Sequence, residues 1–325
     1  MRGIPRVFAA LVALLAVTAL AACGGPELTK TADGRTALRV GIIPTIDAAP
    51  LYLGVSEGIF AKHGLDVTVH VADSGAALIP ATIKQENQIG YANVISDFQA
   101  AEQGLDIKLV HNCCGSGADP AKDVSQVLVK PDGPIRTVGD LAHANIAVNS
   151  LHNIGEVSIK MALEKRGVDV SGIRFTPMPF SDMNDALKRG DVDAIWQVEP
   201  NVQAALAAGF TPLISNFVEA RPEATLGYYL TSGAFAKQNP QVVQAFSDAM
   251  DEANRFATEN PDKAREAVMI NMRFNPEIVS TANLPTYPQG LDRASAEEYA
   301  TYAVKYGAIE KAPDLGGLFW SGPGN

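Results

Sequence analysis

A polar turn with residues suited to ligand binding lies in the middle of the chain. The apolar strand Asn145–Asn149 runs into the turn Ser150–Gly155, and a segment with helical spacing of apolar residues follows. The first N–H groups of a helix are free and carry partial positive charge, so this turn favours an anion or a hydrogen-bond acceptor. Ser150 and Asn153 are candidates both to cap the helix and to bind a ligand. His152 adds a donor, unless it is only a polar loop residue.

A second group of candidates ends the strand Ala194–Val198, which runs into Glu199 and Pro200. A Trp at this place can stack on a flat or methylated ligand, or it can belong to the core. The strand breaks at Pro200, so Glu199 is expected at the rim, as an acceptor for a ligand N–H group. Alternation puts Trp196 and Glu199 on opposite faces, so both reach one ligand only if the chain bends before Pro200.

Polar residues also follow strands elsewhere in the chain. In open α/β sheets the ligand binds beyond the carboxyl ends of the strands. Residues 45 and 47 follow the first predicted strand, and residues 93 and 96 follow the third. Tyr228 and Tyr229 alternate, so at most one of them faces a cleft. The predicted ligand-binding residues are Thr45, Asp47, Asn93, Ser96, Ser150, His152, Asn153, Trp196, Glu199 and Tyr228.

The candidate edge holds carboxylates and lacks Lys and Arg. Its acidic residues are Asp47, Asp97, Glu156 and Glu199. A bare anion such as nitrate would therefore depend on N–H groups alone. A neutral or cationic nitrogen compound, or a zwitterion such as an amino-sulfonate, fits better. A carboxylate binds its N–H or ammonium group, while a helix terminus takes any acidic end.

The motifs of common enzyme classes are missing from the sequence. The five His residues are scattered, and there is no nucleophile elbow, phosphate loop or dinucleotide fingerprint. We therefore predict no catalytic residue, no metal and no cofactor. Cys113 and Cys114 are adjacent and close no long loop, so they are interpreted as small buried residues at a strand end.

Strands alternate with helices along the chain, which is typical of an α/β protein with parallel sheets. With 325 residues, the chain is long enough for two domains. An extended run at 124–129 is followed by a turn cluster, and a second extended run lies at 228–231; both are interpreted as crossings between domains. We expect one lobe from 38–128 and 226–325, and a second from 129–225. Each lobe is expected to be a mostly parallel sheet with helices on both faces.

The first 23 residues are typical of a targeting segment. Arg2 and Arg6 precede an apolar run, and Leu20-Ala21-Ala22-Cys23-Gly24 matches the bacterial lipobox. We predict a signal peptide at 1–22, lipid attachment at Cys23 and a tether at 23–37; the alternative is a plain secretory signal with an incidental Cys. The net charge of −10 argues against binding to nucleic acid or to an anionic membrane surface.

Three segments resemble a family of bacterial solute-binding lipoproteins that serve ABC importers for nitrate, sulfonates, taurine and thiamine-precursor pyrimidines. They are Ala49–Val67, Val138–Val148 and Leu187–Ala194. The resemblance implies a type II periplasmic-binding-protein-like fold, with two lobes joined by two crossovers. It also implies an extracytoplasmic monomer that closes on a small solute, held to the membrane only by its lipid, with an ABC permease and its ATPase as partners.

Two other function classes stay open at this point. One is an enzyme of thiamine-pyrimidine synthesis, because a related fold carries out that reaction with a Cys-rich motif. The pair Cys113-Cys114 is shorter than that motif, and the lipobox places the chain outside the cytoplasm. The other is a surface lipoprotein without a ligand. Stabilisation by a ligand separates a binding protein from such a scaffold, and turnover separates an enzyme from both.

Overall fold

The structure is a computed structural model that describes residues 28–323. The predicted signal peptide at 1–22, the lipid attachment site Cys23 and the first part of the tether lie outside the described residues. The predicted tether extends to residue 37, but β1 already begins at Thr36. The last residues of that segment therefore belong to the first lobe. Within residues 28–323, no helix has the length and apolar character needed to cross a membrane.

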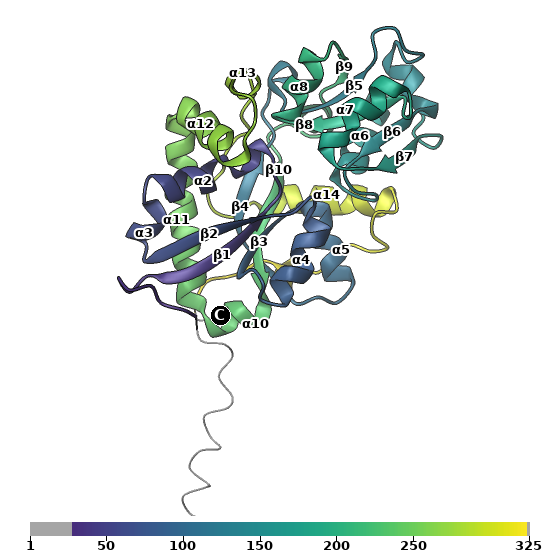
Figure 1. The fold of residues 1–325 in the computed structure, drawn as a ribbon. Helices are drawn as coiled ribbons and strands as arrows, with labels where there is room; N and C mark the ends of the chain where they lie inside the picture. The colour runs from purple at the N-terminus through teal and green to yellow at the C-terminus, as the bar shows by residue number, and fades with distance from the viewer. Residues whose placement is uncertain (1–27, 324–325) are drawn as a thin grey trace, which may run out of the picture.

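The first lobe is built on a five-stranded sheet with the order β2-β1-β3-β10-β4 (Figure 1). Its strands are β1 (Thr36–Ile42), β2 (Leu65–Val71), β3 (Ile89–Asn93), β4 (Ile107–Gly115) and β10 (Thr225–Ser232). Its helices are α2 (Ala49–Ser56), α3 (Ile59–Lys62), α4 (Gly75–Ile83), α5 (Val94–Glu102), α10 (Gly233–Gln238), α11 (Pro240–Glu259), α12 (Pro261–Met272), α13 (Pro276–Ser280), α14 (Arg293–Lys305) and α15 (Leu315–Leu318), with the short η1 (Ile46–Ala48) after β1.

The second lobe repeats this architecture with the strand order β7-β6-β8-β5-β9. Its strands are β5 (Ser125–Val129), β6 (Asn145–Val148), β7 (Arg174–Pro177), β8 (Ala194–Val198) and β9 (Thr211–Ile214). Its helices are α6 (Ile154–Lys165), α7 (Phe180–Arg189), α8 (Asn201–Ala207) and α9 (Asn216–Ala220), with the short helical turns η2 (Pro120–Lys122) and η3 (Val138–His143). The prediction of a two-lobe α/β fold is confirmed.

The sheets are mixed rather than mostly parallel, which corrects the expectation. In each sheet two neighbouring pairs are parallel and two are antiparallel. The antiparallel pairs all involve β5 or β10, the strands by which the chain enters one lobe from the other. A strand that arrives in this way has no preceding crossover helix of its own lobe to turn it parallel. Because β5 pairs with β8 and β9, the first lobe ends before Ser125 and not at the expected residue 128.

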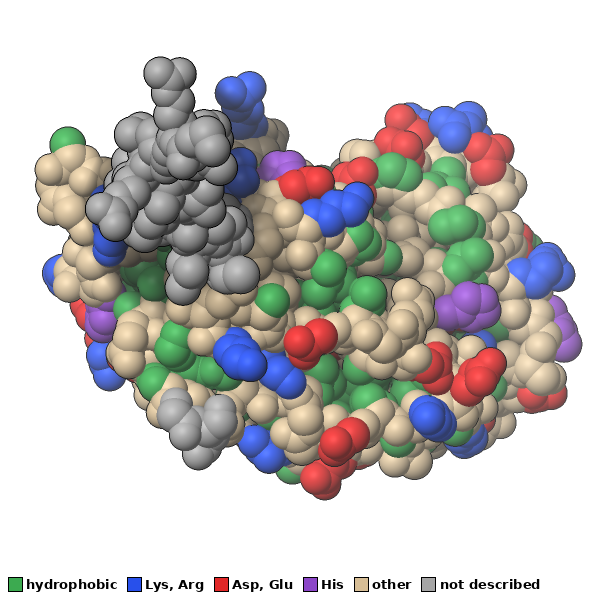
Figure 2. Space-filling view, turned by 90° about the horizontal axis from the view of Figure 1, so that it is seen from below, with side chains coloured by type: hydrophobic (Ala, Val, Ile, Leu, Met, Phe, Trp, Pro, Cys, Tyr) green, Lys and Arg blue, Asp and Glu red, His purple; other side chains and the backbone are tan. Residues whose placement is uncertain are grey.

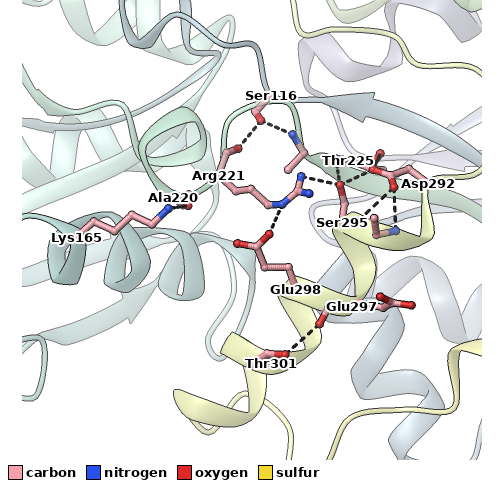
Figure 3. Close-up of polar contacts among 12 residues, drawn as sticks. Ser116, Lys165, Ala220, Arg221, Thr225, Asp292, Ser295, Glu297, Glu298 and Thr301 are labelled. Carbon is pink, nitrogen blue, oxygen red and sulfur yellow. Dashed lines mark hydrogen bonds and ion pairs between the residues drawn. The ribbon is translucent and has the colours of Figure 1, made fainter.

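The two crossovers between the lobes lie side by side and bond to each other. Ser116 N donates to Ala224 O at 2.8 Å, and Ser116 Oγ donates to Arg221 O at 2.8 Å. Arg221 in turn pairs with Glu298 on α14 and donates to Ser295 Oγ at 2.9 Å (Figure 3). The crossovers are thereby fastened to the C-terminal helix α14, which also packs against α5 of the first lobe and α6 of the second (Figure 1).

Charged side chains are dispersed over the face of the molecule seen in Figure 2. On the part of this face that is not grey, acidic and basic side chains are interspersed among neutral ones. No continuous basic surface gathers on that visible part, in keeping with the negative net charge of the chain.

Candidate ligand-binding site

A small cavity lies between the two lobes. Its volume is about 30 Å³, and both lobes contribute to its lining. Its lining from the first lobe is Ile43, Thr45, Asp47, Tyr91, Asn93 and Leu226. Its lining from the second lobe is Asn149, Ile154, Phe180, Trp196, Val198 and Phe217. Four of the predicted ligand-binding residues, at positions 45, 47, 93 and 196, meet here.

Asp47 supplies the one carboxylate among the described residues that line the cavity. It lies in η1, directly after β1, and its side chain is only 7% exposed. Asp47 Oδ2 accepts from Thr45 Oγ1 at 2.8 Å and from Tyr91 OH at 3.3 Å, while Oδ1 is buried without a partner. Burial raises the pKa of this carboxyl, and the hydrogen bonds from Thr45 partly oppose that rise.

Two asparagines add polar groups from opposite lobes. Asn93 Oδ1 caps α5 by accepting from Ile95 N and Ser96 N, which leaves its NH2 group toward the cavity. Asn149 follows β6, and its NH2 group donates to Asp73 O at 3.4 Å. Its Oδ1 is buried without a partner. The cavity therefore holds unpartnered acceptors on both sides, from Asp47 and Asn149.

Aromatic rings form the wall on the second lobe. Trp196 packs against Phe180 with ring centroids 5.4 Å apart and against Phe217 at 6.0 Å. The indole N–H of Trp196 donates to Ser125 Oγ at 2.6 Å, so only its ring surface is left for a ligand. The start of α6 lies against that ring, since a Cβ at Gly155 would come within 2.6 Å of Trp196 Cε3.

The polar turn before α6 closes the lobes and does not line the cavity, except through Ile154. Asn153 caps α6 through Oδ1, and its Nδ2 donates to Ser96 Oγ of the first lobe at 2.8 Å. Ser96, a predicted ligand-binding residue, is thus an interlobe contact outside the cavity lining. The His152 side chain is exposed, and its backbone carbonyl accepts from Gln99 Nε2 at 2.6 Å. Ser150 is half-buried and outside the lining.

Glu199 lies outside the cavity lining, so the structure does not bring it to one ligand with Trp196. Trp196 and Val198 share the strand face that lines the cavity, and Glu199 follows beyond the strand end. Its Oε1 accepts from Gln203 Nε2 at 2.7 Å and from Asn283 N at 3.1 Å, and its Oε2 is buried without a partner. Burial raises the pKa of Glu199 to about 7.

Tyr228 is fully buried in β10 and also lies outside the lining. Its hydroxyl donates to Asp292 O at 2.6 Å. Tyr229 packs on the opposite face against Phe246, so neither tyrosine reaches the cavity, and β10 contributes Leu226 instead. Cys113 and Cys114 are free and buried, as interpreted from the sequence, and Cys114 Sγ lies 3.8 Å from Tyr91 OH.

Several cavity residues were missed by sequence reasoning. Tyr91 shares a strand face with Asn93, so alternation along β3 was a signal for it. Asn149 ends β6 and Phe180 begins α7, both at the carboxyl edge of the second sheet. Phe217 has no local signal, because its segment is largely polar and is interrupted by Pro222, yet α9 forms there.

Comparison with known proteins shows the family to which the chain belongs. Residues 45–264 match the family model described as NMT1/THI5 like. The chain belongs to this family. It is also 26% identical over 227 residues to the taurine-binding periplasmic protein of Escherichia coli strain K12, covering 70% of this chain and 68% of that protein.

Solved structures share the two-lobe architecture. The periplasmic aliphatic sulphonate binding protein SsuA of Escherichia coli matches with a TM-score of 0.72 and 20% identity, over 88% of this chain and 92% of that one. The periplasmic nitrate-binding protein NrtA of Synechocystis PCC 6803 matches with a TM-score of 0.70 and 13% identity, over 85% and 82%. The periplasmic-binding-protein fold is thus confirmed.

The names of these relatives describe binding and not catalysis, in agreement with the prediction of a binding protein. Their periplasmic location supports an extracytoplasmic one for this family member.

Proposed function

We propose that this chain is the solute-binding component of an ABC importer, which captures a small nitrogen-containing solute between its lobes and delivers it to a permease with its ATPase. One observation carries this proposal: unpartnered buried acceptors from both lobes, Asp47 Oδ1 and Asn149 Oδ1, at one closed cavity. A buried polar atom without a partner is costly, so a ligand donor that satisfies both would stabilise the closed form. The proposed solute is either a sulfonate- or taurine-like compound or a pyrimidine-like nitrogen compound.

A lipid on Cys23 is proposed to hold the protein at the outer face of the cell membrane, and the protein is expected to act as a monomer.

The alternatives, a pyrimidine-forming enzyme and a scaffold without a ligand, gain less support. The cysteines on which that enzyme reading would depend are buried behind Tyr91, and burial raises the pKa of both thiols, which disfavours the reactive thiolate.

The proposal is tested by mass spectrometry of small molecules released when the purified protein is mildly denatured. A solute present near one equivalent, which also raises the melting temperature when added back, would support it. Small-angle scattering should then give a larger radius of gyration for the emptied protein and a smaller one with solute restored, at constant helix content. No released solute, together with unchanged scattering across a broad solute library, would contradict the binding function.

A further inference from the structure

The buried polar atoms without a partner in the cavity lining are hydrogen-bond acceptors, and they favour a ligand that carries hydrogen-bond donors. Asp47 Oδ1 and Asn149 Oδ1 are acceptors without partners. The lining hydroxyls are already committed, since Thr45 Oγ1 and Tyr91 OH both donate to Asp47 Oδ2. Among the lining residues, the side-chain donors left for an acidic ligand group are uncharged amide N–H groups, from Asn93 and from Asn149, whose NH2 group has a second hydrogen beside the one given to Asp73 O.

The charges of the lining point the same way. Among the described residues that line the cavity, none is Lys, Arg or His, and Asp47 is the single ionisable carboxyl. At the start of α6, Ile154 N donates to Asn153 Oδ1, and in the turn before it His152 N donates to Glu156 Oε1, so these two N–H groups are already bonded. An oxyanion in this cavity would meet the Asp47 carboxylate with no cation to offset the repulsion.

The wall opposite Asp47 suits a cation. Phe180 and Phe217 each pack against Trp196 on the second lobe, and all three line the cavity. The negative face of an aromatic ring attracts an ammonium group, most strongly where water is excluded. The Trp196 indole N–H is held by Ser125, so this wall presents ring surface rather than a hydrogen-bond donor.

We propose that the solute is a small organic cation, a primary or methylated ammonium compound. Its charged end lies between the acceptors Asp47 Oδ1 and Asn149 Oδ1 and the aromatic wall of Phe180, Trp196 and Phe217. This inference rests on the proposed solute-binding function and names the class of ligand. It separates this chain from relatives whose names describe binding of sulfonate or nitrate.

The inference is tested by calorimetry on protein freed of any co-purified solute, with five probes as simple salts. Ethylammonium and tetramethylammonium carry only positive charge, taurine is a zwitterion, and ethanesulfonate and nitrate are anions. At least one of the two cations is expected to bind tenfold or more tightly than taurine, ethanesulfonate or nitrate. Tighter binding of taurine or of either anion would overturn the inference while leaving the solute-binding function intact.

Variants separate charge recognition from general effects. Asp47→Asn should weaken binding of the preferred cation by about tenfold or more, because it removes a charged acceptor. Asp132→Asn, at an exposed carboxylate in the turn after β5 and outside the lining, removes the same net charge and should change the affinity little. Phe180→Leu keeps apolar bulk but removes a ring face, so tetramethylammonium affinity should fall about two- to fivefold.

Folding of each variant is checked by its melting temperature without ligand. Equal affinity of wild-type protein and a folded Asp47→Asn variant for the preferred cation would overturn the inference. Absence of stabilisation by all five probes would also overturn it. In that case the solute released on denaturation still decides separately whether the binding function stands.

Discussion

Glu199 is a buried carboxyl whose ionisation should depend on whether the chain is folded. Its side chain is fully buried at the end of β8, where Gln203 and the backbone N–H of Asn283 supply two donors to one oxygen. Burial raises its pKa from 4.5 to about 7, and the hydrogen bonds from Gln203 and Asn283 only partly oppose the rise. The folded protein therefore keeps this proton at a pH where the unfolded chain has lost it.

The sign of the effect follows from proton linkage. Between the unfolded and the folded pKa the folded state binds more protons, so the free energy of unfolding falls as the pH rises. The stabilisation is fully present below the unfolded pKa and is lost as the pH rises through the folded pKa. With these two pKa values, Glu199 lowers the free energy of unfolding by about 2.5 kcal/mol between about pH 5 and about pH 8. Glu199→Gln removes this titration and keeps an oxygen that accepts from both donors.

Urea denaturation of wild type and Glu199→Gln at both pH values measures the effect as a double difference. The variant should gain about 2.5 kcal/mol relative to wild type on going from the lower to the higher pH. Asp123, whose pKa is also about 7, titrates in both proteins and cancels. Glu266→Gln on the exposed surface of α12 serves as the matched control and should give no double difference. A value for Glu199→Gln below about 0.5 kcal/mol would refute the reasoning, since the carboxylate would then be hydrated in the folded protein.

Three further perturbations test the cavity walls and the anchor. Asn153→Ala should lower the free energy of unfolding by about 1–2 kcal/mol, because it removes the α6 cap and the interlobe bond to Ser96. Adding Ser96→Ala should then cost less than it does in wild type, and full additivity in denaturation measurements would speak against that bond. Gly155→Ala should destabilise by about 1–3 kcal/mol because its Cβ would clash with Trp196; higher stability would show that α6 and the indole are not in close contact. Cys23→Ala should move the protein from the membrane fraction to the soluble envelope fraction or medium on cell fractionation, and retention in membranes would argue against the lipid anchor.

The relatives and the lining of the cavity suggest different charges for the solute. The taurine-binding relative is 26% identical to this chain, and the sulphonate- and nitrate-binding structures share its fold at 20% and 13% identity. Such likeness carries the architecture, whereas ligand choice depends on a few lining side chains. Here the described lining residues include the Asp47 carboxylate, with one oxygen that has no partner, and no cationic side chain. Binding of cationic and anionic probes therefore decides the charge of the solute.

Local pattern determined much of the fold. The strand β8 begins and ends at the predicted residues Ala194 and Val198, because the apolar run and Pro200 act over a few residues. The segment 49–62, part of one stretch that carries the family resemblance, forms the two helices α2 and α3, since Gly58 adopts φ 70° between them. Of the residues predicted from the rule that ligands lie beyond strand ends, Thr45, Asp47, Asn93 and Trp196 line the cavity between the lobes, and their contact with a ligand stays a prediction.

Only the tertiary structure decided how these groups meet. The alternation that puts Trp196 and Val198 on the cavity wall leaves Glu199 outside it, where Gln203 and Asn283 bind it. Phe217 reaches the cavity because α9 forms in a segment without periodicity, and such a placement depends on packing between elements distant in sequence. Burial and pairing of a polar group are properties of its surroundings in space. The sequence alone therefore indicated the edge of each sheet that faces the other lobe, and the packing of the two lobes decided which side chains line the cavity between them.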